Sequence, residues 1–405
     1  MREELDQGFD PAVDDAVSDL GSLLSTVRRK RAEQAVDLMR TRNVDTLLLG
    51  TPDNIRYVCD YRSLIINESA DWMLCVFDDS GQADIYGAHV RDEALQPHSD
   101  LPAVRSVRPL PSWVPVMAEP EPVVRAIAAA LASARRVGYD AVHPELLQGL
   151  KSALPWVEFS YVGHAIFQAR GRKLPEEIAL MEKAAADNAR ALEAAWTVAV
   201  PGASDYDLLA ASMAQQQRQG AEIITHYTCN VRADDGVWFP TGGRIRPGDG
   251  VFIDQVYYGT GGYASDLTRT KFIGEPAPEV LRAYADLVEV SCAVHAAARP
   301  GVSVSRLDTL LNDSLAKCGL APSPYGLGHG IGLRVCEPPS LTQRDLLHHD
   351  AVLAEGQVIA IEPETAVVHA GRRHALKVED CFLVEADGLR PLGPPAGVDG
   401  VVLPG

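Results

Sequence analysis

Apolar residues along this chain follow two different spacings, and their alternation predicts a mixed α/β protein. Over three stretches, apolar positions recur every three to four residues, as on one face of a helix: 25–42, 121–134 and 176–198. Short apolar runs typical of strands stand at 45–50, 136–139 and 251–253. Two further runs, 71–78 and 83–86, flank the turn sequence DDSG and predict a hairpin, whereas PDN at 52–54 predicts a turn.

The length of 405 residues predicts two domains rather than one. The stretch GRKLPEE at 171–177 is charged and contains proline, so we place the boundary just before it. We expect an acidic tail over 1–25, an N-terminal α/β domain over 26–160 and a second domain over 161–395. The hydrophobic content of 46% is sufficient for a sizeable core.

Composition and charge narrow the class of protein. The net charge of −18 argues against nucleic acid or an anionic membrane as a partner, because both would be repelled. Seven scattered cysteines without a CxxC pattern indicate reduced thiols. The opening MREELDQGFDPAVDD is no signal peptide, and no apolar run reaches membrane-spanning length. We therefore expect a soluble, cytoplasmic protein.

Two aspartates follow the apolar run at 251–253. Asp254 ends that run, and Asp266 comes after a turn rich in glycine. A buried carboxylate is costly unless a positive charge lies beside it. Two carboxylates on adjacent strands would form a ligand pair for a divalent cation. From this stretch alone, a pair of turn or capping aspartates is an equal alternative.

An internal repeat favours the ligand interpretation. VPGAS at 200–204 recurs as RPGVS at 299–303, and GDGVFID at 248–254 recurs as GQVIAIE at 356–362. Each of these strands ends on an acid, Asp254 or Glu362, and each is followed by a second predicted strand that carries an acid, Asp266 or Glu379. Chance similarity of strands that begin with glycine is the alternative. The matched order of helix, helix, strand and acid favours duplication within 176–390.

A histidine completes the set. His329 lies in GLGHGIGL at 326–333, where the glycines let the backbone approach a ligand closely. Taken alone, such a histidine is more often a structural hydrogen-bonding residue. Together with four carboxylates it is a plausible ligand set for two divalent ions of Mn, Fe, Co or Zn.

The five residues and their flanks resemble metallopeptidase family M24, the "pita-bread" fold that includes methionine aminopeptidase, aminopeptidase P, prolidase and creatinase. The flanks that carry the resemblance are SDLTRT, GHGIGL, IEPE and KVED. PDNIRYVCDYRS at 52–63 resembles the N-terminal domain of the creatinase and aminopeptidase P type. The resemblance implies a creatinase-type N-terminal domain, a pita-bread domain of two halves related by a pseudo-twofold axis, and a homodimer.

The resemblance also implies a role for each ligand. Asp254 would bind one cation, Asp266 and Glu379 would bridge both, and His329 and Glu362 would bind the other. Such cations lower the pKa of water and stabilise a developing oxyanion. Glu362 is the best candidate to take the proton from water and pass it to the leaving group.

The chain departs from the family's peptidases at two histidines. The position of the first histidine falls near Val237 and Trp238 in this chain, and the position of the second is occupied by Cys336. The remaining candidates to carry a proton are His226, His374 and Tyr325, and each alone is more often structural. We predict His226 as a second catalytic residue and four residues as substrate contacts: Trp238, Tyr325, Cys336 and His374.

We therefore predict a dinuclear metal-dependent hydrolase that cleaves an amide-type C–N bond in a small molecule or a proline-containing peptide. The loss of both histidines leaves a second hypothesis open, a lyase or tailoring enzyme acting on a small metabolite. A binding module without catalysis, or a metal-free site of the creatinase kind, is disfavoured because all five ligands are kept.

Overall fold

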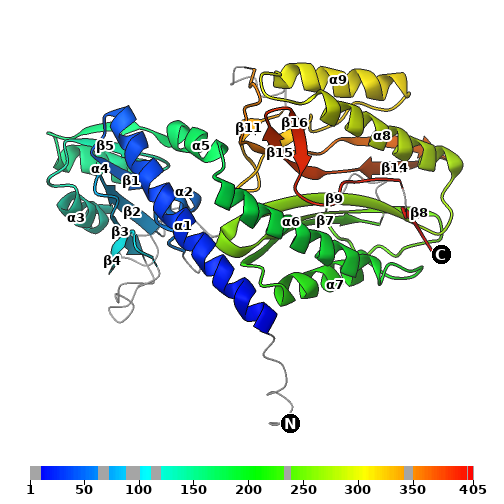
Figure 1. Cartoon of the computed structure of the whole chain (residues 1–405), viewed down its shortest axis with the longest axis horizontal. Helices are drawn as coiled ribbons and strands as arrows, with labels where there is room; N and C mark the ends of the chain where they lie inside the picture. The colour runs from blue at the N-terminus through cyan, green and yellow to red at the C-terminus, as the bar shows by residue number, and fades with distance from the viewer. Residues whose placement is uncertain are drawn as a thin grey trace, which may run out of the picture. The chain divides into compact units, whose positions relative to one another are not determined.

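The computed structural model of this chain describes residues 11–62, 73–87, 101–110, 120–231, 239–341, 350–398 and 400–404. The chain divides into two compact units, Met1–Arg170 and Gly171–Gly405. In both units helices lie against sheets (Figure 1). Among the described residues, no helix combines the length and the apolar character that crossing a bilayer requires.

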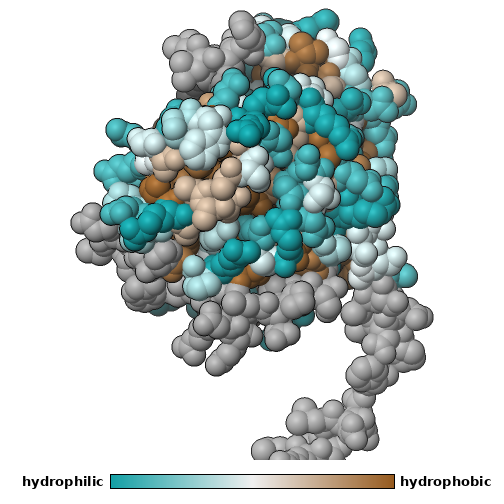
Figure 2. Space-filling model, turned by 90° about the vertical axis from the view of Figure 1, so that its left-hand side faces the viewer, coloured by the Kyte–Doolittle hydropathy of each residue, from teal (hydrophilic) through white to brown (hydrophobic). Residues whose placement is uncertain are grey.

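The first unit contains a six-stranded mixed sheet in the order β4-β3-β2-β1-β5-β6. Its strands are β1 (Thr46–Leu49), β2 (Met73–Asp78), β3 (Ala83–Gly87), β4 (Val104–Pro109), β5 (Arg136–Tyr139) and β6 (Glu158–Tyr161). Its helices are α1 (Pro11–Arg42), α2 (Pro52–Cys59), α3 (Pro120–Ala130), α4 (Pro144–Ala153) and α5 (Gly163–Gly171). Leu48 and Val137 of the sheet pack against Ile127 of α3 in one core. The face shown in Figure 2 is mixed, with small apolar areas bordered by hydrophilic residues.

Most of the local predictions for the first unit are confirmed. The hairpin is β2 and β3, which pair antiparallel, and the strand predicted at 136–139 is β5. The helix predicted over 25–42 begins earlier, at Pro11, so the second half of the expected tail is helical. The turn predicted at 52–54 is wrong. Pro52 instead begins α2, because proline fits the first turn of a helix, where its missing N–H needs no partner.

The carboxylate of Asp140 stabilises the N-terminal end of α2 through hydrogen bonds. This carboxylate is 2% exposed and accepts hydrogen bonds from the backbone N–H of Gly50 (2.7 Å) and from Asn54 Nδ2 (2.8 Å). Arg170 in turn donates to Asn54 Oδ1 at 2.6 Å. The asparagine of the Asn-Ile-Arg-Tyr sequence therefore has a structural role within the first unit.

The second unit contains two sheets and a separate hairpin. The first sheet has the order β17-β9-β8-β7, the second the order β11-β10-β12-β15-β16, and β13 pairs with β14. The strands are β7 (Ile223–Asn230), β8 (Asp249–Tyr258), β9 (Ala264–Ile273), β10 (Gly328–Gly330), β11 (Glu337–Ser340), β12 (Val358–Ile361), β13 (Glu364–His369), β14 (Arg372–Lys377), β15 (Asp380–Glu385), β16 (Gly388–Pro391) and β17 (Val402–Leu403). The helices are α6 (Pro175–Trp196), α7 (Asp205–Arg218), α8 (Pro278–Ala297) and α9 (Val304–Lys317).

The two halves of the second unit repeat the predicted order of elements. Helices α6 and α7 precede β7, β8 and β9, and helices α8 and α9 precede β10, β12 and β15 (Figure 1). Ser204 and Ser303 cap α7 and α9, and each accepts a hydrogen bond from a backbone N–H of the first helical turn. These serines belong to the two copies of the repeated Pro-Gly-x-Ser sequence, so the repeat has the same local structure in each half.

His295 of α8 is half-buried against β15, and its pKa predicts how the stability of the fold depends on pH. Its ring lies 4.3 Å from the ring of Phe382, and burial lowers the pKa of His295 from 6.5 to about 4. Below pH 6.5 the unfolded chain takes up a proton that the folded chain does not. The free energy of unfolding should therefore fall as the pH drops from 6.5 towards 4, by roughly 2–3 kcal/mol from this group.

The measurement is urea unfolding of the wild type and of His295→Gln at pH 7.5, 6.5 and 5.0. Because glutamine does not titrate, the variant should lose less stability than the wild type between pH 6.5 and pH 5.0. Equal losses in the two proteins would show that His295 does not contribute to this pH dependence.

Candidate metal centre

The β8–β9 hairpin places two acids on one face of its sheet. Asp254 is the cross-strand partner of Thr268, and Val256 is the partner of Asp266. Side chains directly opposite each other point to the same face, as do residues two apart in a strand. Asp254 and Asp266 are therefore diagonal neighbours on one face, 2% and 4% exposed.

The second half of the unit supplies two more acids. Glu362 comes directly after β12, and Glu379 lies between β14 and β15. The backbone of Glu379 forms an isolated bridge with Thr268 of β9, and Thr268 Oγ1 donates a hydrogen bond to Glu379 Oε2 at 2.7 Å. The sequence predicted that Glu379 lies within a strand. It lies instead at a break between two strands, where its backbone can pair with β9.

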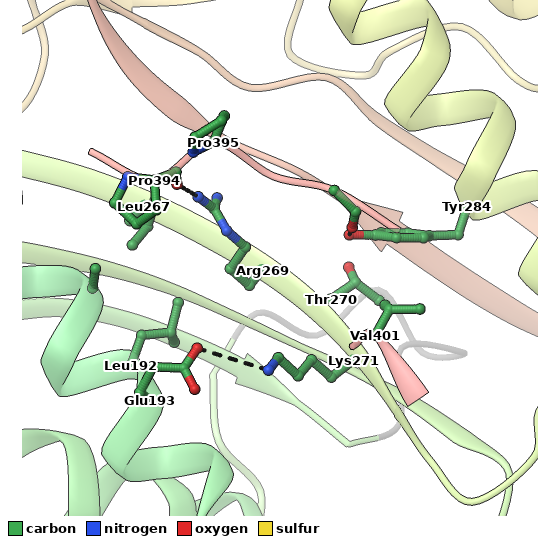
Figure 3. Close-up of a pocket in the computed structure, with 12 residues that line it drawn as sticks. Leu192, Glu193, Leu267, Arg269, Thr270, Lys271, Tyr284, Pro394, Pro395 and Val401 are labelled. Atoms are coloured by element: carbon green, nitrogen blue, oxygen red, sulfur yellow. Dashed lines mark hydrogen bonds and ion pairs between the residues drawn. The ribbon is translucent and has the colours of Figure 1, made fainter. Parts of the chain in front are cut away.

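Arg269 fixes the junction between Thr268 and Glu379 from the opposite face of β9. Its guanidinium donates to the backbone carbonyl of Glu379 (2.8 Å), to Asp380 Oδ1 (2.6 Å) and to the carbonyl of Pro394 (2.5 Å). Figure 3 shows Arg269 reaching Pro394 across a cavity of about 200 Å³ that is also lined by Lys271 and Tyr284. The position of Glu379 is thus determined by contacts on both faces of the strand.

His329 comes from a strand of the second sheet. It lies in β10, between β11 and β12, where two glycines allow the close approach of neighbouring backbones. A Cβ on Gly328 would lie 2.1 Å from the carbonyl oxygen of Ala360, and one on Gly330 would lie 2.4 Å from that of Pro338. His329 Nε2 lies 3.7 Å from Asp266 Oδ2, 3.7 Å from Glu362 Oε1 and 4.0 Å from Glu379 Oε1.

Two buried carboxylate oxygens in this cluster have no hydrogen-bond partner among the described residues: Asp266 Oδ1 and Glu379 Oε1. An unsatisfied buried carboxylate oxygen is costly. Asp266, His329 and Glu379 each offer a ligand atom, and these three atoms lie within 4.8 Å of one another. Mixed nitrogen and oxygen ligands suit a divalent transition-metal ion. The residues present therefore fit a divalent cation next to His329 Nε2.

The electrostatics of the cluster agree with that fit. Burial, together with the neighbouring Glu379 and Asp254, raises the pKa of Asp266 well above its usual value. Burial also raises the pKa of Glu379 to about 7, although Lys377 acts in the opposite direction. Burial lowers the pKa of His329, but the thiol of Cys336 and the carboxylates of Asp266 and Glu362 raise it further than burial lowers it. Each of these shifts reflects negative charge that lacks sufficient compensation.

Lys377 of β14 is a member of the cluster that the sequence analysis did not identify. Its Nζ lies 2.6 Å from Asp254 Oδ2, 2.8 Å from Glu362 Oε2 and 3.3 Å from Glu379 Oε2, and its side chain is 2% exposed. The KVED flank was noted, but no role was given to its lysine. A lysine two residues before a buried acid, and flanked by apolar residues, is the signal that could have revealed it.

The other predicted site residues lie in several places. Cys336 is exposed in the loop between β10 and β11, and its thiol raises the pKa of His329. Tyr325 is 42% exposed in the loop before β10. His374 lies in β14, three residues before Lys377 and so on the opposite face of the hairpin. His226 lies in β7, but its side chain is outside the described part of the structure, and Trp238 is outside the described residues.

Comparisons with protein families match both units. The model of metallopeptidase family M24 matches residues 179–386, and that of the creatinase/prolidase N-terminal domain matches residues 31–171. The Xaa-Pro dipeptidase of Pyrococcus horikoshii is 25% identical over 373 residues, which cover 90% of this chain and 97% of that protein. A probable dipeptidase PepE of Mycobacterium tuberculosis is 40% identical over 147 residues, covering 36% of this chain and 37% of that protein.

Solved structures show the same fold. The prolidase of Pyrococcus horikoshii superposes with a TM-score of 0.73 at 23% identity, over 91% of this chain and 99% of that chain. The X-Pro aminopeptidase of Thermotoga maritima gives a TM-score of 0.76 at 19% identity, over 92% of this chain and 99% of that one. The predicted fold class, a creatinase-type N-terminal domain followed by a pita-bread domain, is confirmed.

The unpartnered oxygens predict that a divalent cation stabilises the folded chain. Adding Mn²⁺ to chelator-treated protein should raise Tm, because the cation binds the folded state and compensates buried negative charge. At free Mn²⁺ about 100 times its Kd, the shift should be roughly 5–10 °C. The measurement is differential scanning calorimetry with and without Mn²⁺.

Asp266→Asn should lose most of this shift. Asp249→Asn is the matched control, because Asp249 is a buried aspartate of β8 that pairs with Arg372 at 2.6 Å, away from the cluster. The control protein should be less stable than the wild type but should keep the full Mn²⁺ shift. Equal shifts in Asp266→Asn and the wild type would exclude Asp266 as a ligand.

Proposed function

Because this chain belongs to metallopeptidase family M24, as its sequence predicted, we propose that it is a metal-dependent hydrolase of short proline-containing peptides or small amides. The bond cleaved would be an amide-type C–N bond. The observation that carries the proposal is the grouping of Asp266, His329 and Glu379, which each offer a ligand atom within 4.8 Å of the others, with Asp266 Oδ1 and Glu379 Oε1 buried without a hydrogen-bond partner. The names of relatives that match along most of the chain, Xaa-Pro dipeptidases, support the substrate class.

Four residues would hold a divalent cation: Asp266, His329, Glu362 and Glu379. A cation held there would lower the pKa of water and stabilise the oxyanion that develops on the substrate carbonyl. The two-cation centre implied by the sequence resemblance would in addition need Asp254. The number of cations and the identity of the metal stay predictions, and so does the homodimer.

Glu362 is the residue best placed to carry a proton. Its side chain is 15% exposed, whereas those of Asp254, Asp266 and Glu379 are 3%, 6% and 1% exposed. Glu362 Oε2 accepts from Lys377, and Oε1 faces His329. Glu362 can therefore take a proton from water on its open side and pass it to the leaving nitrogen. His226 stays a proposal as a second proton carrier, and Trp238, Tyr325 and His374 stay proposals as substrate contacts.

One observation favours a second candidate function. Cys336 stands where the family's peptidases have a histidine, and its thiol raises the pKa of His329. A thiol replaces the imidazole that would bind the carbonyl of a peptide. This substitution favours a lyase or a tailoring enzyme acting on a small metabolite. A panel of Xaa-Pro dipeptides, small amides and betaine-type compounds, assayed by mass spectrometry with Mn²⁺, would separate the two functions.

We expect hydrolysis of at least one Xaa-Pro dipeptide or small amide, and its loss in Glu362→Gln. Removing the proton carrier should lower kcat about 10²–10⁴-fold and change KM little. Glu385→Gln is the control, because Glu385 pairs with Arg390 in β15–β16, outside the cluster. The proposal would be wrong if chelator-treated protein and Glu362→Gln both turned over substrate at the wild-type rate.

Cys336→His should raise kcat/KM for Xaa-Pro dipeptides by about ten-fold, because an imidazole can donate to the substrate carbonyl near neutral pH. Cys336→Ala should show no such gain. If Cys336→His lowers turnover of a non-peptide substrate and leaves dipeptide turnover at background, the second candidate function is preferred.

A further inference from the structure

The ammonium of Lys377 lies among the carboxylates that would hold a second cation. Lysine carries three N–H donors, and Nζ lies within 2.6–3.3 Å of one oxygen from each of three acids. Its backbone position is also fixed. Thr270 Oγ1 donates to the Lys377 carbonyl at 2.8 Å and accepts from the Lys377 N–H at 3.2 Å. The side chain is therefore held within the cluster by both ends.

The oxygens of the cluster divide into two groups. Asp254 Oδ2, Glu362 Oε2 and Glu379 Oε2 face Lys377 Nζ. The second oxygens of the two glutamates, Glu362 Oε1 and Glu379 Oε1, face His329 Nε2. The orphan oxygens are Glu379 Oε1 and Asp266 Oδ1, whereas the three oxygens on the Lys377 side are all paired. Among the described residues, none of the three oxygens that face Lys377 lacks a partner, whereas Glu379 Oε1, on the His329 side, has no hydrogen-bond partner.

We propose that Lys377 takes the place of a second metal ion, so that this chain binds one divalent cation tightly, on the His329 side, and a second one only weakly. This inference rests on the proposed function in one respect: the cation bound tightly on the His329 side is the one that the proposed hydrolysis would use. An incoming second cation would compete with the ammonium for Asp254 Oδ2 and would be repelled by its charge. Within a buried cluster that repulsion should weaken a second equivalent by at least about 100-fold.

The ammonium and a metal ion would then have different functions. The cation next to His329 can meet water and substrate, since His329 and Glu362 are the two most exposed members of the cluster, at 14% and 15%. Lys377 is fully buried and would act as a fixed charge that holds Asp254, Glu362 and Glu379 together. It is a positioning residue in this arrangement and not a catalytic one.

The test is metal stoichiometry of the full-length, chelator-stripped chain, measured with Mn²⁺ alone by equilibrium dialysis and electron paramagnetic resonance. The wild type should bind about one equivalent tightly and give the six-line spectrum of an isolated Mn²⁺ ion. Lys377→Met removes the ammonium but keeps an unbranched side chain, so a second equivalent should bind tightly and the spectrum should show spin coupling. Lys377→Arg keeps the charge and should stay at one tight equivalent.

Asp254→Asn provides a second, independent measurement that does not depend on the folding of the lysine variants. If Asp254 pairs with Lys377 and does not bind the tightly held cation, this variant should still bind one equivalent with an affinity within a few-fold of the wild type. Asp266→Asn should lose that equivalent. Two tight equivalents in the wild type, a single one in folded Lys377→Met, or loss of the tight equivalent in Asp254→Asn would each overturn the inference.

These outcomes are distinguishable from failure of the proposed function. Two tight equivalents with hydrolytic activity would leave the proposed function standing and remove only the role of Lys377. A wild-type chain that binds no Mn²⁺ and is active without metal would overturn both.

Discussion

Three buried carboxylates and the half-buried carboxylate of Glu362 meet within a few ångströms in the second unit, and this concentration of negative charge constrains the groups around it. Each acid is unfavourable alone, since a buried anion without a partner strongly favours protonation or unfolding. The charge is compensated on one side by Lys377. Asp266 Oδ1 and Glu379 Oε1 are buried without a hydrogen-bond partner, and a cation would meet that demand. The cluster is therefore suited to bind a cation, because its charge is only partly neutralised.

The cluster also explains how the two halves of the second unit are joined. Neither half has the full set: Asp254 and Asp266 come from the β8–β9 hairpin, and His329, Glu362 and Glu379 come from the second half of the unit. The backbone bridge between Thr268 and Glu379, with Arg269 holding Glu379 from the opposite face, fixes one half against the other. The strand junction that supports the fold is thus the same junction that positions the ligands. A change at this junction would affect stability and metal binding together.

The chemistry expected of the site follows from which members reach solvent. His329 and Glu362 are the accessible members, with Cys336 next to His329, while Asp254, Glu379 and Lys377 are enclosed. In the proposed function, proton transfer and substrate contact would lie on one side of the cluster and charge compensation on the other. A hydrolase needs both, because an exposed base is useful only where buried groups keep the cation in a fixed position.

The sequence by itself determined the fold class, the order of elements in both halves and the identity of five of the six cluster residues. These features depend on local patterns: apolar spacing, the repeated Pro-Gly-x-Ser helix starts, and acids that end apolar strands. The local errors, at α1 and at Pro52, have equally local causes. The tertiary structure decided what no local pattern contains. Lys377 looks like an ordinary strand residue until β14 is placed beside β8 and β9. The pairing of each oxygen, and hence the side on which a cation fits, depends on distances between segments more than one hundred residues apart in sequence, which only the folded chain brings together.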